Sequence, residues 1–341
     1  MRDEFTTPFG DSSLSAKLQS ALSGVDCRGA CAAVLSPELP GGQSTAGLGF
    51  SPERTFHIGS VGKALNGLIF SAMVAEGAVS RSASLSDFLP LAGAPVGDVT
   101  LEALVNHTSG LPSVGGGRAA ALRSLWRLIR KKDPQPEGFS DLMAQLRRAR
   151  LGTSEFHYSN LGGAALGHAL AAADGVSYPQ LIAQRIAQPL GCPTLAVLDP
   201  DAAEREADVP GLSVYNTAQE PWSGEGYAPA GGIRASAQDM VIVLEAVLDG
   251  RLPGQGPGPS QRYSTGMEDP NGGEHLVSDG WFIQEAAGNT GELAWHNGAA
   301  NGFVSAVVLD RAVRRGVFVS LRDGTMDSDP LPAALSLLRE V

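Results

Sequence analysis

Residues 60–70 read Ser60-Val61-Gly62-Lys63-Ala64-Leu65-Asn66-Gly67-Leu68-Ile69-Phe70, and they hold the one Ser-x-x-Lys pattern of the chain. The apolar run predicts a buried helix that begins at Ser60. Positions i and i+3 of a helix share a face, so the amine of Lys63 can reach the hydroxyl of Ser60. The stretch therefore predicts a nucleophile beside a base.

Serine at a helix start is often only an N-cap, so Ser60 by itself is weak evidence for chemistry. Lys63 strengthens it, because this lysine is one of only four in the chain and stands among apolar residues. A charged ammonium is costly there, and desolvation favours the neutral amine, which can accept the serine proton. The helix N-terminus also favours negative charge developing on Ser60.

A second candidate group is Tyr158-Ser159-Asn160. A tyrosine beside a lysine can act as a base or a proton shuttle, and an asparagine two residues later can hydrogen-bond a substrate carbonyl. In isolation, the same residues are more often a core tyrosine followed by a turn asparagine.

The third group is the segment His296-Asn297-Gly298-Ala299-Ala300-Asn301-Gly302-Phe303. A strand edge without bulky side chains lets backbone N–H groups approach a reacting carbonyl as an oxyanion hole. His296 alone would more often be a strand residue that faces solvent.

Composition limits the function classes. The chain has 341 residues, 43% hydrophobic content and a net charge of −11, so it can form a sizeable core and is not a general nucleic-acid binder. Three cysteines and six scattered histidines show no metal-ligand spacing, so we expect no metal and no cofactor. The N-terminal residues lack the apolar core of a signal peptide, and no apolar run reaches bilayer length. These patterns predict a cytoplasmic protein without a membrane anchor.

The order of predicted elements indicates an α+β fold, an antiparallel β-sheet flanked by helices with an all-helical insertion. Helix and strand patterns at both ends predict a sheet domain from residues 1–95 plus 230–341. The middle, residues 96–229, reads as helices and loops. We expect an active-site cleft between the two domains.

Taken together, the three motifs resemble those of the serine β-lactamase and penicillin-binding-protein superfamily, in its class C-like branch of β-lactamases, esterases and D-amino-acid peptidases. The resemblance runs from about Gly29 to Leu321. It includes Asn106-His107-Thr108-Ser109-Gly110-Leu111-Pro112, which is typical of this branch, and Pro229-Ala230-Gly231-Gly232-Ile233. The Glu-x-x-Leu-Asn pattern of class A enzymes is absent from the sequence.

The resemblance implies that Ser60 is the acylated nucleophile and that Lys63 and Tyr158 share the general base and acid work. It implies a β-lactamase/transpeptidase-like fold. The segment that contains Asn106 and His107 is expected to support the helical domain rather than to react.

For the substrate side, the resemblance implies that Asn160 orients the acyl amide of the substrate and Lys63. The backbone N–H groups of Ser60 and Ala299, beside Gly298, would form the oxyanion hole. His296 stands where many β-lactamases have a lysine. Because histidine is mostly neutral near pH 7, selection for a substrate carboxylate is weakened.

We therefore expect a serine hydrolase or acyltransferase that forms an acyl-enzyme on Ser60 from a small-molecule ester, amide or thioester. A class C-like β-lactamase or D-amino-acid peptidase is one alternative. A catalytically silent scaffold that only binds a ligand or partner is another.

The segment Arg118–Arg150 holds nine of the 25 basic residues: Arg118, Arg123, Arg127, Arg130, Lys131, Lys132, Arg147, Arg148 and Arg150. Most charge clusters are only solvated helix faces. The more specific hypothesis is docking of an acidic partner, such as a carrier protein that delivers a thioester, or of an anionic substrate.

Overall fold

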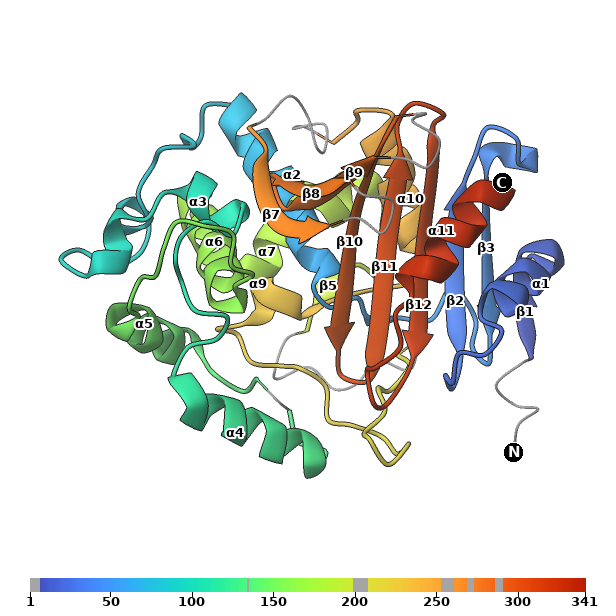
Figure 1. The fold of residues 1–341 in the computed structure, drawn as a ribbon, viewed down its shortest axis with the longest axis horizontal. Helices are drawn as coiled ribbons and strands as arrows, with labels where there is room; N and C mark the ends of the chain where they lie inside the picture. The colour runs from blue at the N-terminus through green and yellow to red at the C-terminus, as the bar shows by residue number, and fades with distance from the viewer. Residues whose placement is uncertain (1–6, 134, 199–207, 253–260, 269–272, 286–290) are drawn as a thin grey trace.

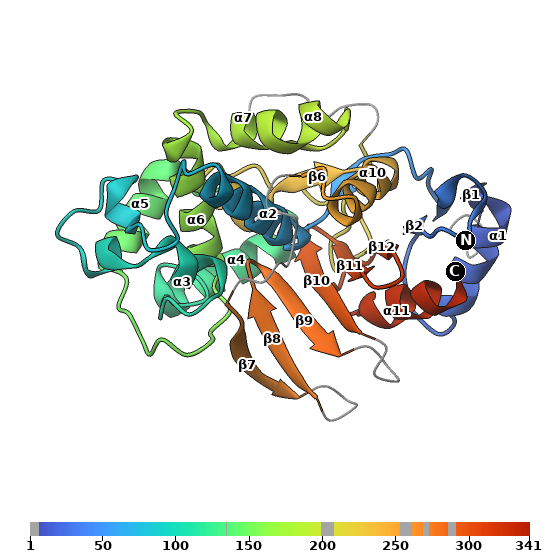
Figure 2. The same ribbon diagram turned by 90° about the horizontal axis from the view of Figure 1, so that it is seen from above.

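A nine-stranded antiparallel sheet runs through the molecule in the order β1-β3-β2-β12-β11-β10-β9-β8-β7 (Figures 1 and 2). The computed structural model describes residues 7–133, 135–198, 208–252, 261–268, 273–285 and 291–341. The strands are β1 Pro8–Gly10, β2 Ala30–Leu35, β3 Gln43–Leu48, β7 Tyr263–Glu268, β8 Glu274–Ser278, β9 Trp281–Glu285, β10 Glu292–Ala300, β11 Phe303–Asp310 and β12 Arg315–Arg322.

Helices cover both faces of this sheet. The helices α1 (Ser12–Ala21) and α11 (Leu331–Glu340) pack on one face, where Ala32 of β2 joins their apolar cluster. The helices α2 (Val61–Ala75) and α10 (Ala237–Leu248) pack on the other, where Ala33 lies. Successive strand residues point to opposite faces, so a strand buried on both sides must be apolar throughout, as β2 is.

The remaining helices lie on the side of α2 away from the sheet (Figure 1). They are α3 Leu101–Val105, α4 Gly117–Ile129, α5 Phe139–Arg148, α6 Asn160–Ala173, α7 Tyr178–Ile182, α8 Gln188–Leu190 and α9 Ala228–Gly231, and a π-helical segment, Ala183–Ala187, joins α7 to α8. The predicted fold class, an antiparallel sheet flanked by helices with a helical insertion, is confirmed. The proposed domain boundaries stay a prediction.

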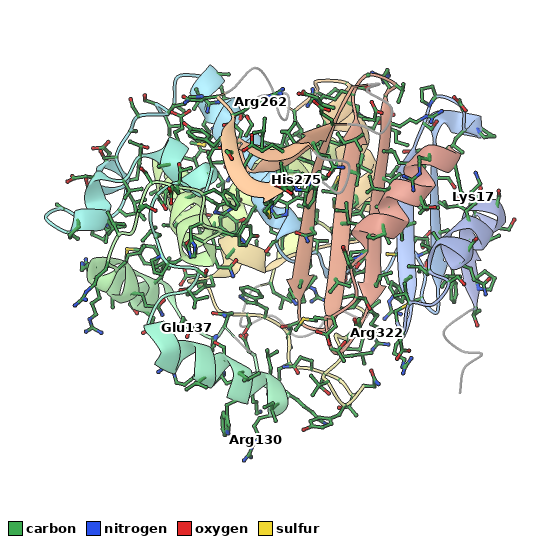
Figure 3. The ribbon with its side chains drawn as sticks, in the orientation of Figure 1. Lys17, Arg130, Glu137, Arg262, His275 and Arg322 are labelled. Carbon is green, nitrogen blue, oxygen red and sulfur yellow. The ribbon has the colours of Figure 1, made fainter. Side chains whose placement is uncertain are left out.

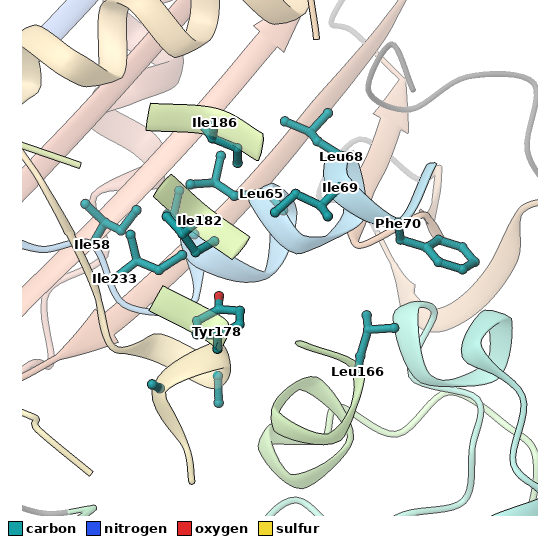
Figure 4. Packing of buried hydrophobic residues seen from close by; sticks show 14 of the residues in the cluster. Ile58, Leu65, Leu68, Ile69, Phe70, Leu166, Tyr178, Ile182, Ile186 and Ile233 are labelled. Atoms are coloured by element: carbon teal, nitrogen blue, oxygen red, sulfur yellow. The ribbon is translucent and has the colours of Figure 1, made fainter. Parts of the chain in front are cut away.

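The helix α2 forms the centre of the larger apolar cluster. Of its residues, Val61 to Met73 are all buried. Leu65, Leu68 and Ile69 pack among side chains from α7, from the π-helical segment and from the short strand β6 (Ile233–Ala235), as Figure 4 shows. A helix that is apolar on every side belongs in a core, so this position follows from the composition of the stretch.

A small second sheet aligns the start of α2. In it β6 lies between β4 (Phe56–His57) and β5 (Ala196–Val197). Gly59 follows β4 with φ of 57°, a left-handed conformation that favours glycine. This turn sends the chain from β4 into α2 and fixes where Ser60 stands.

The turn between β8 and β9 joins three parts of the fold. The buried Asp279 accepts hydrogen bonds from Ser71 of α2 (2.7 Å) and from the guanidinium of Arg81 (2.6 and 2.7 Å). Its backbone N–H donates to the Asn106 side chain at 2.8 Å. The turn therefore holds the sheet, α2 and the end of α3 together.

Sequence patterns did not indicate β7 and β8. Both are short and mostly polar or exposed, with residues such as Ser264, Glu268 and Glu274. An outer strand that buries little of its surface carries no clear alternation of apolar and polar residues. Within the described residues, no helix is long and apolar enough to cross a membrane.

Gly67 of α2 permits the close packing of this helix against the β8–β9 turn. A Cβ at position 67 would lie 1.8 Å from the carbonyl oxygen of Asp279, so the backbone would have to move. We expect Gly67→Ala to lower the free energy of unfolding by about 1–3 kcal/mol in urea denaturation. Gly152→Ala is the matched control, because its Cβ would meet only an ordinary contact at 3.6 Å. Equal stability of the two variants would contradict this packing argument.

Candidate active site

Ser60 stands at the N-terminal end of α2 with helical backbone angles, φ −67° and ψ −6°. Ser60 occupies the N-cap position of α2, but its hydroxyl makes no capping hydrogen bond. The side chain is partly exposed beside a cavity, and its hydroxyl is 3.0 Å from the amine of Lys63. The spacing of the two residues along the helix produces this contact.

Lys63 is 4% exposed, and its amine has two further neighbours. Nζ lies 2.8 Å from Oδ1 of Asn160 and 2.5 Å from the carbonyl oxygen of Ala230, at the end of α9. Gly163 of α6 leaves room for the lysine chain, because a Cβ there would lie 2.8 Å from Cε of Lys63. Three segments far apart in the sequence thus meet at one nitrogen.

Burial lowers the pKa of Lys63 from its ordinary value to about 7. A neutral amine has two N–H donors and one lone pair. The oxygens of Asn160 and Ala230 can only accept, so they take the two N–H groups. The lone pair then faces the Ser60 hydroxyl, which is the arrangement of a general base beside a nucleophile.

Tyr158 is held by the turn before α6. The hydroxyl of Ser159 caps this helix by accepting from the N–H of Gly162 at 2.9 Å, and it donates to the carbonyl of Pro112 at 2.7 Å. Tyr158 is hydrogen-bonded to Ser60, which opposes the effect of burial on its pKa. Burial has the larger effect and raises the pKa of Tyr158, so the phenol is neutral near pH 7.

His107 supports the turn before α6 by contacts with Ser159 and Tyr158. Its Nδ1 accepts from the N–H of Ser159 at 3.2 Å, and its ring lies 4.5 Å from the ring of Tyr158, centroid to centroid. With φ of 57°, His107 has the left-handed backbone that turns the segment after α3. Its neighbour Asn106 is fully buried and binds the β8–β9 turn. These contacts support the structural role that the sequence predicts for this segment.

The strand β10 passes directly in front of Ser60. A Cβ at Gly298 would lie 2.6 Å from the nitrogen of Ser60, and a Cβ at Gly59 would lie 2.6 Å from the nitrogen of Ala299. Only glycine at these two positions allows the strand and the turn to approach so closely. The backbone nitrogens of Ser60 and Ala299 are therefore neighbours at the mouth of the site.

The side chain of His296 on β10 points into the protein rather than to solvent. It is 1% exposed, so the solvent-facing interpretation is wrong. Its ring lies 6.2 Å from that of Tyr158 and 5.3 Å from that of Phe282, and Nδ1 is 2.5 Å from the carbonyl oxygen of Asn297. Burial lowers the pKa of His296 to about 3. The imidazole is therefore neutral and lies behind Tyr158.

A cavity of about 390 Å³ opens beside Ser60. Most of its described walls are apolar, and among the described residues that line it Asp329 alone is charged. The lining residues are Ser60, Phe156, Tyr158, Met267, Phe282, Trp295, Asn297, Gly298, Ala299, Val304, Met326, Ser328, Asp329 and Pro330.

The structure brings together Ser60, Lys63, Tyr158 and Asn160, with Gly298 and Ala299 alongside. The sequence did not reveal the carbonyl of Ala230 as a partner of Lys63, because a backbone oxygen has no residue signature. Nor did it reveal the apolar cavity wall, which comes from separate strands and loops. Across the described residues, no three His, Cys, Asp or Glu side chains are grouped so that they could hold a metal ion.

Comparison with known proteins gives a consistent result. The family model described as Beta-lactamase matches residues 38–338. No curated protein is similar enough in sequence to be matched.

Several solved structures share the fold. One is the octameric penicillin-binding protein homologue from Pyrococcus abyssi, which is 19% identical, has a TM-score of 0.78 and is aligned over 96% of this chain and 76% of its own. A class C β-lactamase from Rhodobacter sphaeroides is 19% identical over 96% and 97% of the two chains, with a TM-score of 0.74. A D-stereospecific amidohydrolase from Streptomyces sp. is 20% identical over 93% and 96%, with a TM-score of 0.75.

The protonation of Lys63 can be measured directly. We expect the ¹³Cε resonance of Lys63 to titrate with a midpoint of about 7, with the amine protonated below that pH and neutral above it. The signal is assigned by its loss in Lys63→Met. A midpoint at the ordinary lysine value would show that the amine is charged at neutral pH and would contradict its role as a proton acceptor.

Proposed function

Because the chain belongs to the Beta-lactamase family of serine hydrolases, we propose that it hydrolyses a neutral ester with an apolar substituent. The reaction proceeds through an acyl-enzyme on Ser60. The observation that carries this proposal is the cavity beside Ser60, whose described lining includes many apolar side chains and no cation.

Acylation begins with the proton of Ser60. Its hydroxyl oxygen attacks the ester carbonyl carbon while the proton moves to the lone pair of Lys63, 3.0 Å away. The carbonyl oxygen becomes negative and accepts hydrogen bonds from the backbone N–H groups of Ser60 and Ala299. The fixed approach of β10 to the Ser60 turn prepares this pair of donors before the substrate arrives.

The attack of Ser60 forms a tetrahedral intermediate, and its collapse breaks the bond between the carbonyl carbon and the leaving alcohol. Tyr158, a neutral phenol beside Ser60, donates its proton to the leaving oxygen and recovers a proton from Lys63. Water then attacks the acyl-enzyme, Lys63 or Tyr158 takes a proton from it, and Ser60 leaves with a proton. The carboxylic acid product is released and the resting state returns.

The electrostatics of the site favour a neutral substrate over one with a carboxylate. His296 is neutral and buried behind Tyr158, and so it supplies no fixed positive charge. Asp329 at the cavity wall repels an anion. β-Lactams and peptide C-termini carry carboxylates, so they fit this site less well than simple esters.

The size and lining of the cavity suggest the kind of substituent. About 390 Å³ is at the small end of ligand pockets. Phe282 and Trp295 stack with ring centroids 4.7 Å apart and form part of its wall. A short aliphatic chain or a single ring suits such a space.

Intact mass spectrometry tests the acyl-enzyme. We expect p-nitrophenyl butyrate to be turned over and to leave a transient adduct of the butyryl group on the wild-type protein, with both lost in Ser60→Ala. Ser109→Ala is the matched control, because Ser109 is also a partly buried serine but has a backbone N–H as its hydrogen-bond partner. We also expect a chromogenic cephalosporin to react more slowly than the ester.

Faster turnover of the cephalosporin would instead identify a β-lactamase or D-peptidase. A folded protein that neither reagent acylates would be a silent scaffold, and the proposal would fail.

Met267→Trp tests the cavity. Met267 is a half-exposed residue of β7 that lines it, so a larger ring there should fill space without disturbing the core. We expect kcat/KM for p-nitrophenyl hexanoate to fall by roughly tenfold or more, while the acetate ester reacts at a nearly unchanged rate. Val313→Trp, at an exposed position outside the cavity, is the control. An equal effect on both esters would show that the chain does not bind in this cavity.

A further inference from the structure

The helix α4 presents an apolar stripe to solvent. Four of its side chains are large, hydrophobic and exposed: Leu122 at 67%, Leu125 at 55%, Trp126 at 55% and Ile129 at 44%. Their spacing of i, i+3, i+4 and i+7 places them along one face of the helix. An amphipathic helix normally buries such a face against its own protein, but here the face points outward.

The helix α4 and the three residues that follow it carry positive charge and no acid. Residues 117–132 contain six basic residues and no Asp or Glu, in a chain whose net charge is −11. Arg130 is exposed and forms no ion pair within the described part of the chain, whereas Arg123 is exposed but lies near Glu137. The guanidinium of Arg130 lies 5.0 Å from the ring centroid of Trp126, so charge borders the apolar stripe. In Figure 3, Arg130 points away from the body of the molecule.

The nine basic residues of the segment 118–150 do not form a single patch. Arg147 donates to the carbonyl of Pro90, and Lys132 pairs with Glu220. Arg148 and Arg150 line a different cavity with Arg123, next to Glu137 and Asp141. The side chain of Arg118 lies outside the description. Arg127 of α4 donates to the carbonyl of Asp133. The charge left beside the stripe is therefore mainly that of Arg130 and Lys131, directly after α4.

A loop adds exposed side chains next to this helix. Val214 and Tyr215 are 46% and 61% exposed, within the turn closed by the bridge between Leu212 and Ala218. The chain just after this turn is bonded to the end of α4, because the N–H of Glu220 donates to the carbonyl of Lys131 at 3.1 Å. In Figure 1 the yellow loop and α4 reach the same lower edge of the molecule.

We propose that α4, with the 212–218 turn, binds peripherally to the surface of an anionic lipid bilayer. Exposed leucine, isoleucine and tryptophan beside arginine and lysine are the composition of helices that lie in a membrane interface. The stripe lies on a projecting helix. A flat bilayer can bind such a helix, whereas a protein partner would need a groove of matching shape. A second copy packed symmetrically on this stripe would bring two sets of positive charges together. This mode of contact needs no membrane-spanning segment, and it does not depend on the proposed esterase activity.

Vesicle co-sedimentation of the full chain tests the proposal. We expect binding to vesicles of phosphatidylcholine and phosphatidylglycerol in equal parts, with little binding to pure phosphatidylcholine and a decrease as salt is raised. The double variant Leu125→Ser/Trp126→Ser removes part of the stripe, and Arg130→Glu reverses one charge. Each should weaken binding, the double variant by about tenfold or more.

Two matched controls should bind as the wild type does. Val313→Ser removes a similarly exposed apolar side chain elsewhere, and Arg339→Glu makes the same charge change on α11. Hydrolysis of a soluble ester should be the same in all four variants, which separates this test from that of the active site.

Unchanged vesicle binding in the stripe variants would overturn the proposal. So would failure of the wild type to bind anionic vesicles. In that case, a dimer that dissociates in Leu125→Ser/Trp126→Ser, measured by light scattering, would assign the stripe to a second copy. If light scattering instead showed a monomer, an acidic protein would be the remaining candidate partner for this surface.

Discussion

The burial of one lysine amine determines how the parts of this molecule meet. Lys63 comes from α2, Asn160 from the start of α6 and the carbonyl of Ala230 from the end of α9, and the latter two both accept from Nζ of Lys63. An uncompensated ammonium in this place would be costly, and so the fold satisfies the nitrogen with acceptors and lowers its pKa. The hydrogen bonds that stabilise the core in this region are therefore the same ones that direct a lone pair at Ser60.

The groups proposed for chemistry and those proposed for substrate choice come largely from different parts of the chain. The reacting groups stand on α2, on the turn before α6 and on the backbone of β10. The cavity wall includes Met267 of β7, Phe282 of β9 and residues 326–330, while β10 contributes to the wall as well as to the reacting groups. Related chains can therefore keep one reaction and change its substrate by altering the outer strands.

Much of the fold and part of the site follow from local sequence patterns. The apolar run of β2 and Ser236, which caps α10, are local signals for a strand and for a helix start that the sequence itself carries. The contact of Ser60 with Lys63 follows from helical spacing. The burial of His296 cannot be predicted in this way, because whether a strand side chain is buried depends on which elements cover that face of the sheet. The same is true of α4, whose apolar face reads as a buried one until its surroundings are known.

The β8–β9 turn has a mechanical consequence for the site. Asp279 is bonded to Ser71 of α2 and to Arg81, while Asn106 of the helical side holds its backbone. Rotating the helical part away from the sheet would break the bond between the N–H of Asp279 and the side chain of Asn106, and both groups would be buried without a partner. This hydrogen bond opposes a hinge at the boundary between the two parts. Turnover should therefore not be limited by a large closing motion of two bodies.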